Sequence, residues 1–197
     1  MAEKNTQKEI IVVSGLPRSG TSMMMKMLDA AGLPVLTDSQ READEDNPKG
    51  YFELEQVKDL GKTDDVSWLE DARGKVVKVV SPLLKHLPRE GYRYKVLFTQ
   101  RNLYEILASQ RKMLLRRGEP ADTIPDEDMA QFFMRNLEEV RELLDGNDCF
   151  ETVFFRYRQV LDEPVEQAKR MNEFLGLSSD PVEIAAVVDP LLYRNRS

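Results

Sequence analysis

The sequence predicts a three-layer α/β/α domain in which helices cover both faces of a central, mainly parallel sheet. Short β-branched runs alternate with segments of helical periodicity, and glycine or proline marks the ends of most of these segments. Hydrophobic residues make up 41% and charged residues 32% of the 197, which is typical of a folded, water-soluble chain. We expect one domain over residues 1–197, with residues 1–8 as a flexible N-terminus.

The first 32 residues predict a strand, a loop and a helix. Residues 9–14, Glu-Ile-Ile-Val-Val-Ser, form a β-branched run that is typical of a strand buried on both faces in a parallel sheet. A glycine-bearing loop follows at once, and apolar residues then recur at helical spacing over 23–31, before Gly32 supplies a stop. Residues 37–50 are polar and end in Asn-Pro-Lys-Gly, so we expect a loop there.

The rest of the chain continues this alternation. Apolar runs predict strands at 75–80, 95–99 and 152–156. Helical spacing of apolar residues predicts helices at 102–114, 129–144, 164–175 and about 181–189. In open parallel sheets ligands bind at the carboxyl ends of the strands, so four segments are expected to build a site. These segments are the loop at 15–22, the turns at 78–82 and 99–102, and the stretch after Arg156.

Charge, cysteine content and hydropathy exclude several classes of protein. The net charge is −7, which argues against a general nucleic-acid binder. The single cysteine, Cys149, cannot form a disulfide framework and is expected to be a structural thiol. No apolar run approaches the ~20 residues of a bilayer span, and the apolar stretch at 10–13 is too short for a signal peptide. We therefore expect a cytoplasmic protein without a membrane span.

The loop Gly15-Leu16-Pro17-Arg18-Ser19-Gly20-Thr21-Ser22 has most features of a phosphate-binding P-loop. Glycines let the backbone turn tightly, so that successive N–H groups point at an anion, and the following helix adds its positive end. Ser19, Thr21 and Ser22 add hydroxyl donors, while Arg18 adds a fixed charge whose fork suits phosphate or sulfate oxygens. An ordinary strand-to-helix turn is the structural alternative, but it needs no such density of donors.

The loop differs from those that bind Mg-ATP. Such loops end in Gly-Lys-Ser/Thr, whereas Thr21 stands in the lysine position here and the charge has moved to Arg18. An ATPase also uses an aspartate at the end of a strand to help hold Mg²⁺. The apolar strands of this chain close instead on Ser81, Thr99 and Arg156. The sequence therefore favours a phosphate ligand that is held without a metal.

Residues 16–22 resemble the 5′-phosphosulfate loop of the sulfotransferases, in which Pro-Lys/Arg-Ser-Gly-Thr-Thr/Ser binds the donor 3′-phosphoadenosine 5′-phosphosulfate (PAPS). Residues 96–102, Val-Leu-Phe-Thr-Gln-Arg-Asn, resemble the 3′-phosphate motif of the same family. In that motif an arginine ends a strand and a serine lies on the next helix, which matches Arg101 and Ser109 here. A fixed charge and a hydroxyl donor can together hold a phosphomonoester. The resemblance implies a small, bacterial-type sulfotransferase with a P-loop fold.

The C-terminal third is similar to the same family. Residues 153–157 and then 162–177 resemble its strand, its tyrosine and its Pro-led helix that closes on Phe-Leu-Gly. The resemblance implies that Tyr157 lies by the adenine, although the residue can also simply cap the sheet edge. In relatives, basic residues near the C-terminus often contact the 3′-phosphate. The resemblance therefore implies this role for Arg194 or Arg196, and a frayed terminus is the alternative.

Sulfuryl transfer requires a cation at the leaving phosphate and a base at the acceptor. Arg18 and the loop N–H groups fit the first task, and the resemblance implies Lys78 as a second cation. Cytosolic small-molecule members have Lys-Thr-His where this chain has Lys-Val-Val at 78–80, so their histidine is absent. The single histidine, His86, lies farther along and is expected to be a surface or structural residue.

Other members of the family use a carboxylate after the first helix as the base. The candidates are Asp38, Glu42, Glu53 and Glu55. We favour Glu53 because the aromatic turn before it can hold it at the cleft. We place Asp38 second because of its distance from the loop.

The expected function is metal-free sulfuryl transfer from PAPS to a hydroxyl or amine of a small-molecule, carbohydrate or peptide acceptor, with no nucleic-acid partner. One alternative is a nucleotide or small-molecule kinase of the same fold, against which the missing loop lysine and strand-end aspartate argue. The other is a non-catalytic nucleotide-binding protein, which the absent histidine keeps open. Neither the acceptor nor the oligomeric state follows from the sequence.

Overall fold

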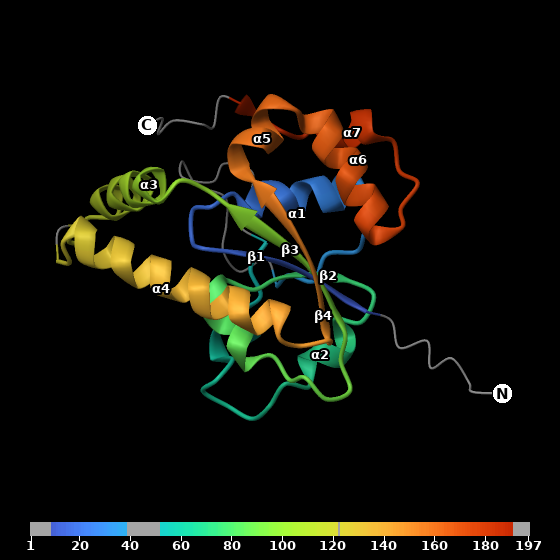
Figure 1. The fold of residues 1–197 in the computed structure, drawn as a ribbon, viewed down its shortest axis with the longest axis horizontal. Helices are drawn as coiled ribbons and strands as arrows, with labels where there is room; N and C mark the ends of the chain where they lie inside the picture. The colour runs from blue at the N-terminus through green and yellow to red at the C-terminus, as the bar shows by residue number, and fades with distance from the viewer. Residues whose placement is uncertain (1–8, 39–51, 122, 191–197) are drawn as a thin grey trace.

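A four-stranded, all-parallel sheet forms the centre of the computed structural model, which describes residues 9–38, 52–121 and 123–190 (Figure 1). Across the sheet the strands are β2 (Val76–Lys78), β1 (Ile10–Gly15), β3 (Tyr94–Gln100) and β4 (Phe150–Arg156). Gly15 pairs with Thr99, and Gln100 pairs with Arg156. This register brings the carboxyl ends of β1, β3 and β4 to one edge, where the sequence predicted a site.

Helices cover both faces of the sheet (Figure 1). The α-helices are α1 (Thr21–Ala30), α2 (Trp68–Asp71), α3 (Leu103–Arg116), α4 (Asp126–Asp145), α5 (Tyr157–Asp162), α6 (Pro164–Leu175) and α7 (Pro181–Ala185). Two 3₁₀ helices, η1 (Glu55–Asp59) and η2 (Ser81–His86), flank β2 in the chain. Among the described residues, none of these helices is both long and apolar enough to cross a membrane.

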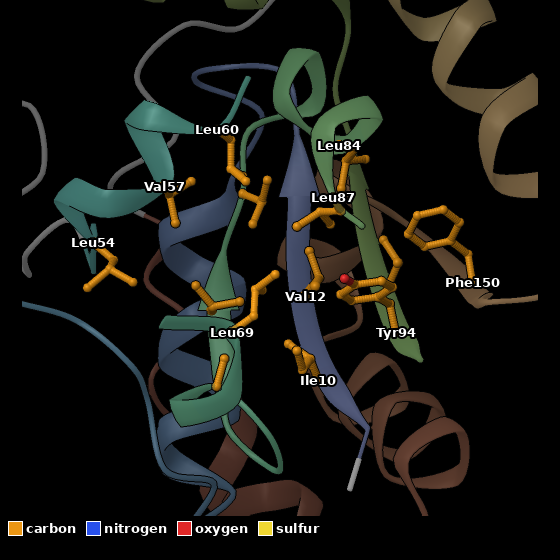
Figure 2. Close-up of a cluster of buried hydrophobic side chains, with 14 of the residues drawn as sticks. Ile10, Val12, Leu54, Val57, Leu60, Leu69, Leu84, Leu87, Tyr94 and Phe150 are labelled. Atoms are coloured by element: carbon orange, nitrogen blue, oxygen red, sulfur yellow. The ribbon is translucent and has the colours of Figure 1, made fainter. Parts of the chain in front are cut away.

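The alternation of side chains along β1 divides the core into two layers. Ile10 and Val12 face a cluster that includes residues of η1, α2, η2 and α4 (Figure 2). Ile11 and Val13 face the opposite cluster, which includes residues of α1, α6 and α7. A fully buried aliphatic side chain of this kind contributes about 1.5–3 kcal/mol to stability. Burial on both faces explains why the strand is continuously apolar, as the sequence analysis expected.

Most predicted elements are confirmed, and the differences are at short segments. The predicted strand at 75–80 is shorter, because the backbone at Ser81 and Pro82 already turns into η2. The α3 helix begins directly after Asn102, whose side chain caps it by accepting a hydrogen bond from the backbone N–H of Tyr104. Helices η1, α2 and α5 were not predicted, since runs of four to six residues are too short to show a helical period.

Several predictions fall outside the described residues. These are the flexible N-terminus at 1–8, part of the predicted loop at 37–50, the candidate base Glu42, and the basic tail residues Arg194 and Arg196.

Candidate functional site

The loop between β1 and α1 is braced from within by hydroxyl groups. Ser19 is 1% exposed, and its Oγ donates to the carbonyl of Leu16 at 2.6 Å. The same Oγ lies 2.8 Å from Oγ1 of Thr99, which donates to the carbonyl of Ser14 at 3.1 Å. A Cβ at Gly15 would collide with both hydroxyls, and its φ of 148° also favours glycine. In this geometry Ser19 joins the loop to β3, a structural task that the sequence analysis did not foresee.

The N-terminus of α1 follows this loop directly. Gly20 starts the helix in a left-handed conformation with φ of 103°, and a Cβ there would overlap the ring of Tyr157. Within residues 9–38, 52–121 and 123–190, no side chain caps this end by a hydrogen bond, and the first turn of α1 carries no acidic residue. Unbonded N–H groups at a helix start attract phosphate or sulfate. Thr21 and Ser22, the two predicted hydroxyl ligands, form the first turn.

Arg18 and Ser109, predicted from two separate motifs, contact each other. The Nε of Arg18 donates to Oγ of Ser109 at 3.0 Å, although 91 residues separate them in the chain. Arg18 itself has φ of 69°, a left-handed backbone that costs a non-glycine residue of order 1 kcal/mol. Its carbonyl accepts a hydrogen bond from Nη1 of Arg101 at 3.1 Å, which holds the loop in this conformation.

Arg101 is placed between three partners at the end of β3. Its Nε donates to Oε2 of Glu105 at 2.9 Å, and both side chains are 8% exposed. Its guanidinium carbon lies 4.4 Å from the centre of the Tyr157 ring, a cation–π arrangement. The sequence analysis missed Glu105. The signal was present, because Glu105 lies in the first turn of the predicted helix, only four positions after Arg101.

A pocket of about 390 Å³ lies beside this cluster, at the carboxyl ends of β3 and β4. Arg101, Glu105 and Tyr157 line one part of it, and Arg156 and Arg158 line another. The sequence analysis named the stretch after Arg156 as part of the expected site but assigned no role to the two flanking arginines. Their signal was their place on either side of Tyr157, at the end of a predicted strand.

Lys78 and Glu53, the predicted second cation and base, form a pair at the end of β2. The Nζ of Lys78 lies 3.6 Å from Oε1 of Glu53, and their side chains are 8% and 23% exposed. The Nζ of Lys58 lies 3.9 Å from the other carboxylate oxygen of Glu53. Lys78 is in register with Val13 of β1, two residues before the phosphate loop begins. The carboxylate is therefore held at the same edge of the sheet as that loop.

Asp38, the second candidate base, hydrogen-bonds to the backbone of residues 53 and 55. Its Oδ2 accepts a hydrogen bond from the backbone N–H of Glu55 at 2.6 Å, and its own N–H donates to the carbonyl of Glu53 at 3.3 Å. The Oγ1 of Thr37 donates to that same carbonyl at 2.8 Å. Residues 37 and 38 thus fix the backbone that carries Glu53. Phe52, just before it, has a left-handed backbone with φ of 52°, and the rest of the expected aromatic turn lies outside the described residues.

The remaining candidates have structural surroundings. His86 is exposed and its imidazole lies against Gly61, where a Cβ would collide with it, so the expectation of a surface residue is confirmed. Cys149 packs against the core, and burial raises the pKa of its thiol, which favours the uncharged, structural form. Ser81 donates to Oδ1 of the buried Asn136 at 2.7 Å, which ties the turn after β2 to α4.

Comparison with known proteins supports the fold. No protein-family model matches the chain, and no curated protein matches it. The sulfotransferase domain from the curacin biosynthetic pathway superposes with a TM-score of 0.55 at 16% identity, covering 92% of this chain and 78% of that one. The sulfotransferase domain of the Synechococcus PCC 7002 olefin synthase gives the same TM-score and identity, covering 100% and 86%.

Most of the similar structures are sulfotransferases. A sugar kinase from Janibacter sp. HTCC2649 also superposes, over 92% of this chain and 99% of that one, at 16% identity and a TM-score of only 0.46. The chain has the α/β fold of P-loop sulfotransferase structures, with a four-stranded, all-parallel sheet flanked by helices.

Proposed function

We propose that this protein transfers a sulfuryl group from PAPS to a hydroxyl or amine of an acceptor. The observation that carries the proposal is the cluster of Arg18, Ser109 and Arg101, joined by hydrogen bonds of 3.0 and 3.1 Å. Two segments that separately resemble the 5′-phosphosulfate and 3′-phosphate motifs meet in it. A donor with an anionic group at each end needs such paired sites, whereas ATP has no 3′-phosphate.

Four groups of the chain suit the phosphosulfate end of the donor. The loop N–H groups and the N-terminus of α1 face an anion with partial positive charge. Thr21 and Ser22 add hydroxyls in the first turn, and Arg18 adds a fixed charge. PAPS supplies the activated sulfuryl group. These residues would bind it, orient it and neutralise charge on the oxygen that leaves with the phosphate.

Glu53 is the proposed base. Its carboxylate would accept the proton of the acceptor hydroxyl or amine as the acceptor atom bonds to sulfur and the bond from sulfur to the phosphate oxygen breaks. Lys78, 3.6 Å from this carboxylate, would fix its position and add positive charge at the edge of the sheet where the transfer occurs. Asp38 has a supporting role in this proposal, because its carboxylate holds the backbone of Glu55.

The experiment that tests the function is a thermal-shift titration of the purified protein. The ligands are 3′-phosphoadenosine 5′-phosphate, 5′-AMP, ADP and ATP, each with and without Mg²⁺. A ligand that binds only the folded protein raises Tm by mass action. We expect the bisphosphate to raise Tm more than 5′-AMP, independently of Mg²⁺.

The same titration separates the two alternatives. Stabilisation by ATP that depends on Mg²⁺, with none by the bisphosphate, would exclude the proposed donor and favour a kinase. A second assay incubates the protein with PAPS and with phenols, alcohols or amines, and measures the bisphosphate that is released. If the bisphosphate stabilises the protein but none is released in this assay, the protein is a non-catalytic nucleotide-binding protein.

A further inference from the structure

The pocket at the ends of β3 and β4 carries more positive charge than the two predicted motifs account for. Three arginines and one glutamate line it, so its lining side chains have a net charge of +2. The motif residue Arg101 contributes no net charge, because Glu105 lies 2.9 Å away and is equally buried. Ser109, the other motif residue, is a neutral donor. The positive charge of the pocket therefore comes from Arg156 and Arg158.

These two arginines differ in their partners. The Nε of Arg158 lies 3.3 Å from Oδ2 of Asp162 on the same helix, and both side chains are exposed, at 69% and 61%. Arg156 is also exposed. Within the described part of the chain, its side chain makes no hydrogen bond or ion pair, although its backbone belongs to the β3–β4 pairing. Of the three arginines, Arg156 is thus the one whose charge is not already shared with a carboxylate.

The backbone of Arg156 is fixed although its side chain is exposed. It is the last residue of β4, in register with Gln100 on β3, and it is also the N-cap of α5. Gln100, the partner of Arg156 on β3, is followed directly by Arg101. The two arginines therefore line the pocket from the ends of adjacent strands. Replacing the side chain of Arg156 would therefore change the charge of the pocket without removing a contact of the fold.

We propose that Arg156 determines specificity for a nucleotide with a 3′-phosphate. This inference rests on the proposed function and deepens it. A phosphomonoester carries nearly two negative charges, and the Arg101–Glu105 pair offers none in net to balance them. Arg156 supplies that charge to the 3′-phosphate, while Arg101 and Ser109 supply directed hydrogen bonds. Arg158 contributes less, because it shares its charge with Asp162.

The test is a calorimetric titration of the full chain with 3′-phosphoadenosine 5′-phosphate and, separately, with 5′-AMP. The variants are Arg156→Ala, Arg156→Lys and, as a matched control, Arg135→Ala, an exposed arginine of α4 outside the pocket. We expect Arg156→Ala to weaken bisphosphate binding about tenfold and to leave 5′-AMP binding unchanged. Lysine at this position should restore part of the loss, since it keeps the charge but not the fork. The control should bind both ligands as the unchanged protein does.

Three outcomes overturn the inference. If the unchanged protein prefers the bisphosphate and Arg156→Ala keeps that preference, the proposed function stands and Arg156 has no part in it. If Arg156→Ala weakens both ligands equally, the residue attracts anions in general and is not specific. If the unchanged protein shows no preference for the bisphosphate, both the inference and the proposed function fail.

Discussion

Nε of Arg18 and Oγ of Ser109 lie 3.0 Å apart, and this contact joins the loop between β1 and α1 to helix α3. Arg18 lies in the loop between β1 and α1, whereas Ser109 is the seventh residue of α3, the helix that follows β3. The parallel order of β1 and β3 makes the contact possible, because it places the start of each helix at the same edge of the sheet.

Removing the Ser109 hydroxyl should weaken binding of the bisphosphate more than it weakens the fold. For Ser109→Ala we expect a loss of about 1–1.5 kcal/mol in the binding free energy of 3′-phosphoadenosine 5′-phosphate, or roughly tenfold in Kd. Binding of 5′-AMP should change little. The matched control is Ser178→Ala, at an exposed serine beyond α6. An equal loss for both nucleotides would remove Ser109 from the 3′-phosphate site.

The buried Arg101–Glu105 pair should be a strong stabilising contact. Glu105→Gln leaves the Arg101 charge without its carboxylate, so the free energy of unfolding should fall by about 2–3 kcal/mol in urea denaturation. The control is Glu166→Gln, which breaks an ion pair with Lys169 whose side chains are 66% and 58% exposed. That control should change stability by less than about 0.5 kcal/mol.

The same Glu105→Gln variant also tests how the pair affects binding of the bisphosphate. Since the charge of Arg101 is no longer balanced within the pocket, the affinity for the bisphosphate should stay the same or increase. A merely structural role for the pair predicts the opposite, namely weaker binding in step with the weaker fold. Titration at a temperature where the variant is fully folded distinguishes the two.

Glu53→Gln should separate binding from turnover. The amide keeps the shape of the side chain but cannot accept a proton, so we expect a fall of roughly 10²–10⁴ in the rate of bisphosphate release from PAPS with an acceptor present. Stabilisation by the bisphosphate should be unchanged. Glu55→Gln is the control, because that carboxylate pairs with Lys58 on the exposed side of η1. Equal turnover in both variants would move the base elsewhere.

Acid should weaken a contact at the opposite end of the sheet. Hydrogen bonds from Arg73, at 2.7 and 2.9 Å, and from the hydroxyl of Tyr92, at 2.8 Å, lower the pKa of Glu70 from 4.5 to about 2. Because the folded pKa is the lower one, this contribution to stability is complete above pH 4.5 and is lost as the pH falls toward about 2.

The check on this contact is a comparison of Glu70→Gln with the unchanged protein in urea denaturation at a series of pH values. The difference in midpoint between the two should be constant near neutral pH and should shrink below pH 4.5. A difference that stays constant down to the acid limit of folding would show that the Glu70 carboxylate is not selectively stabilised in the folded state.

Local chemistry predicted the long elements well and the short ones poorly. The helix from Pro164 to Leu175 has both a proline at its start and Gly176 in a left-handed conformation at its end, so its bounds follow from those two residues. Helix α5 is too short to show a helical period in the sequence, and no glycine marks its end. Strand β4 runs directly into it at Tyr157, and the next helix begins at Pro164, two residues after α5 ends. Its existence depends on packing against the sheet, where Val160 is buried.

The loop at residues 15–22 and the residue types around it could be predicted from local sequence alone. Glycines at 15 and 20 are required wherever a loop turns this tightly, and a β-branched strand before it and an apolar helix after it fix its setting. The sequence also placed Arg101 and Ser109 on a strand end and a helix face, because both follow from local periodicity.

Which of these side chains meet, and which already have partners, follows from the way the strands are arranged in space. Ser19 hydrogen-bonds within the loop and to β3, Glu105 balances Arg101, and Lys78 pairs with Glu53 across the end of β2. Each of these contacts depends on the order and register of parallel strands that are far apart in the sequence. Periodicity describes one segment at a time, so it cannot say which strand ends become neighbours. The loop is therefore a local property of this chain, whereas the charge available around it is a property of the fold.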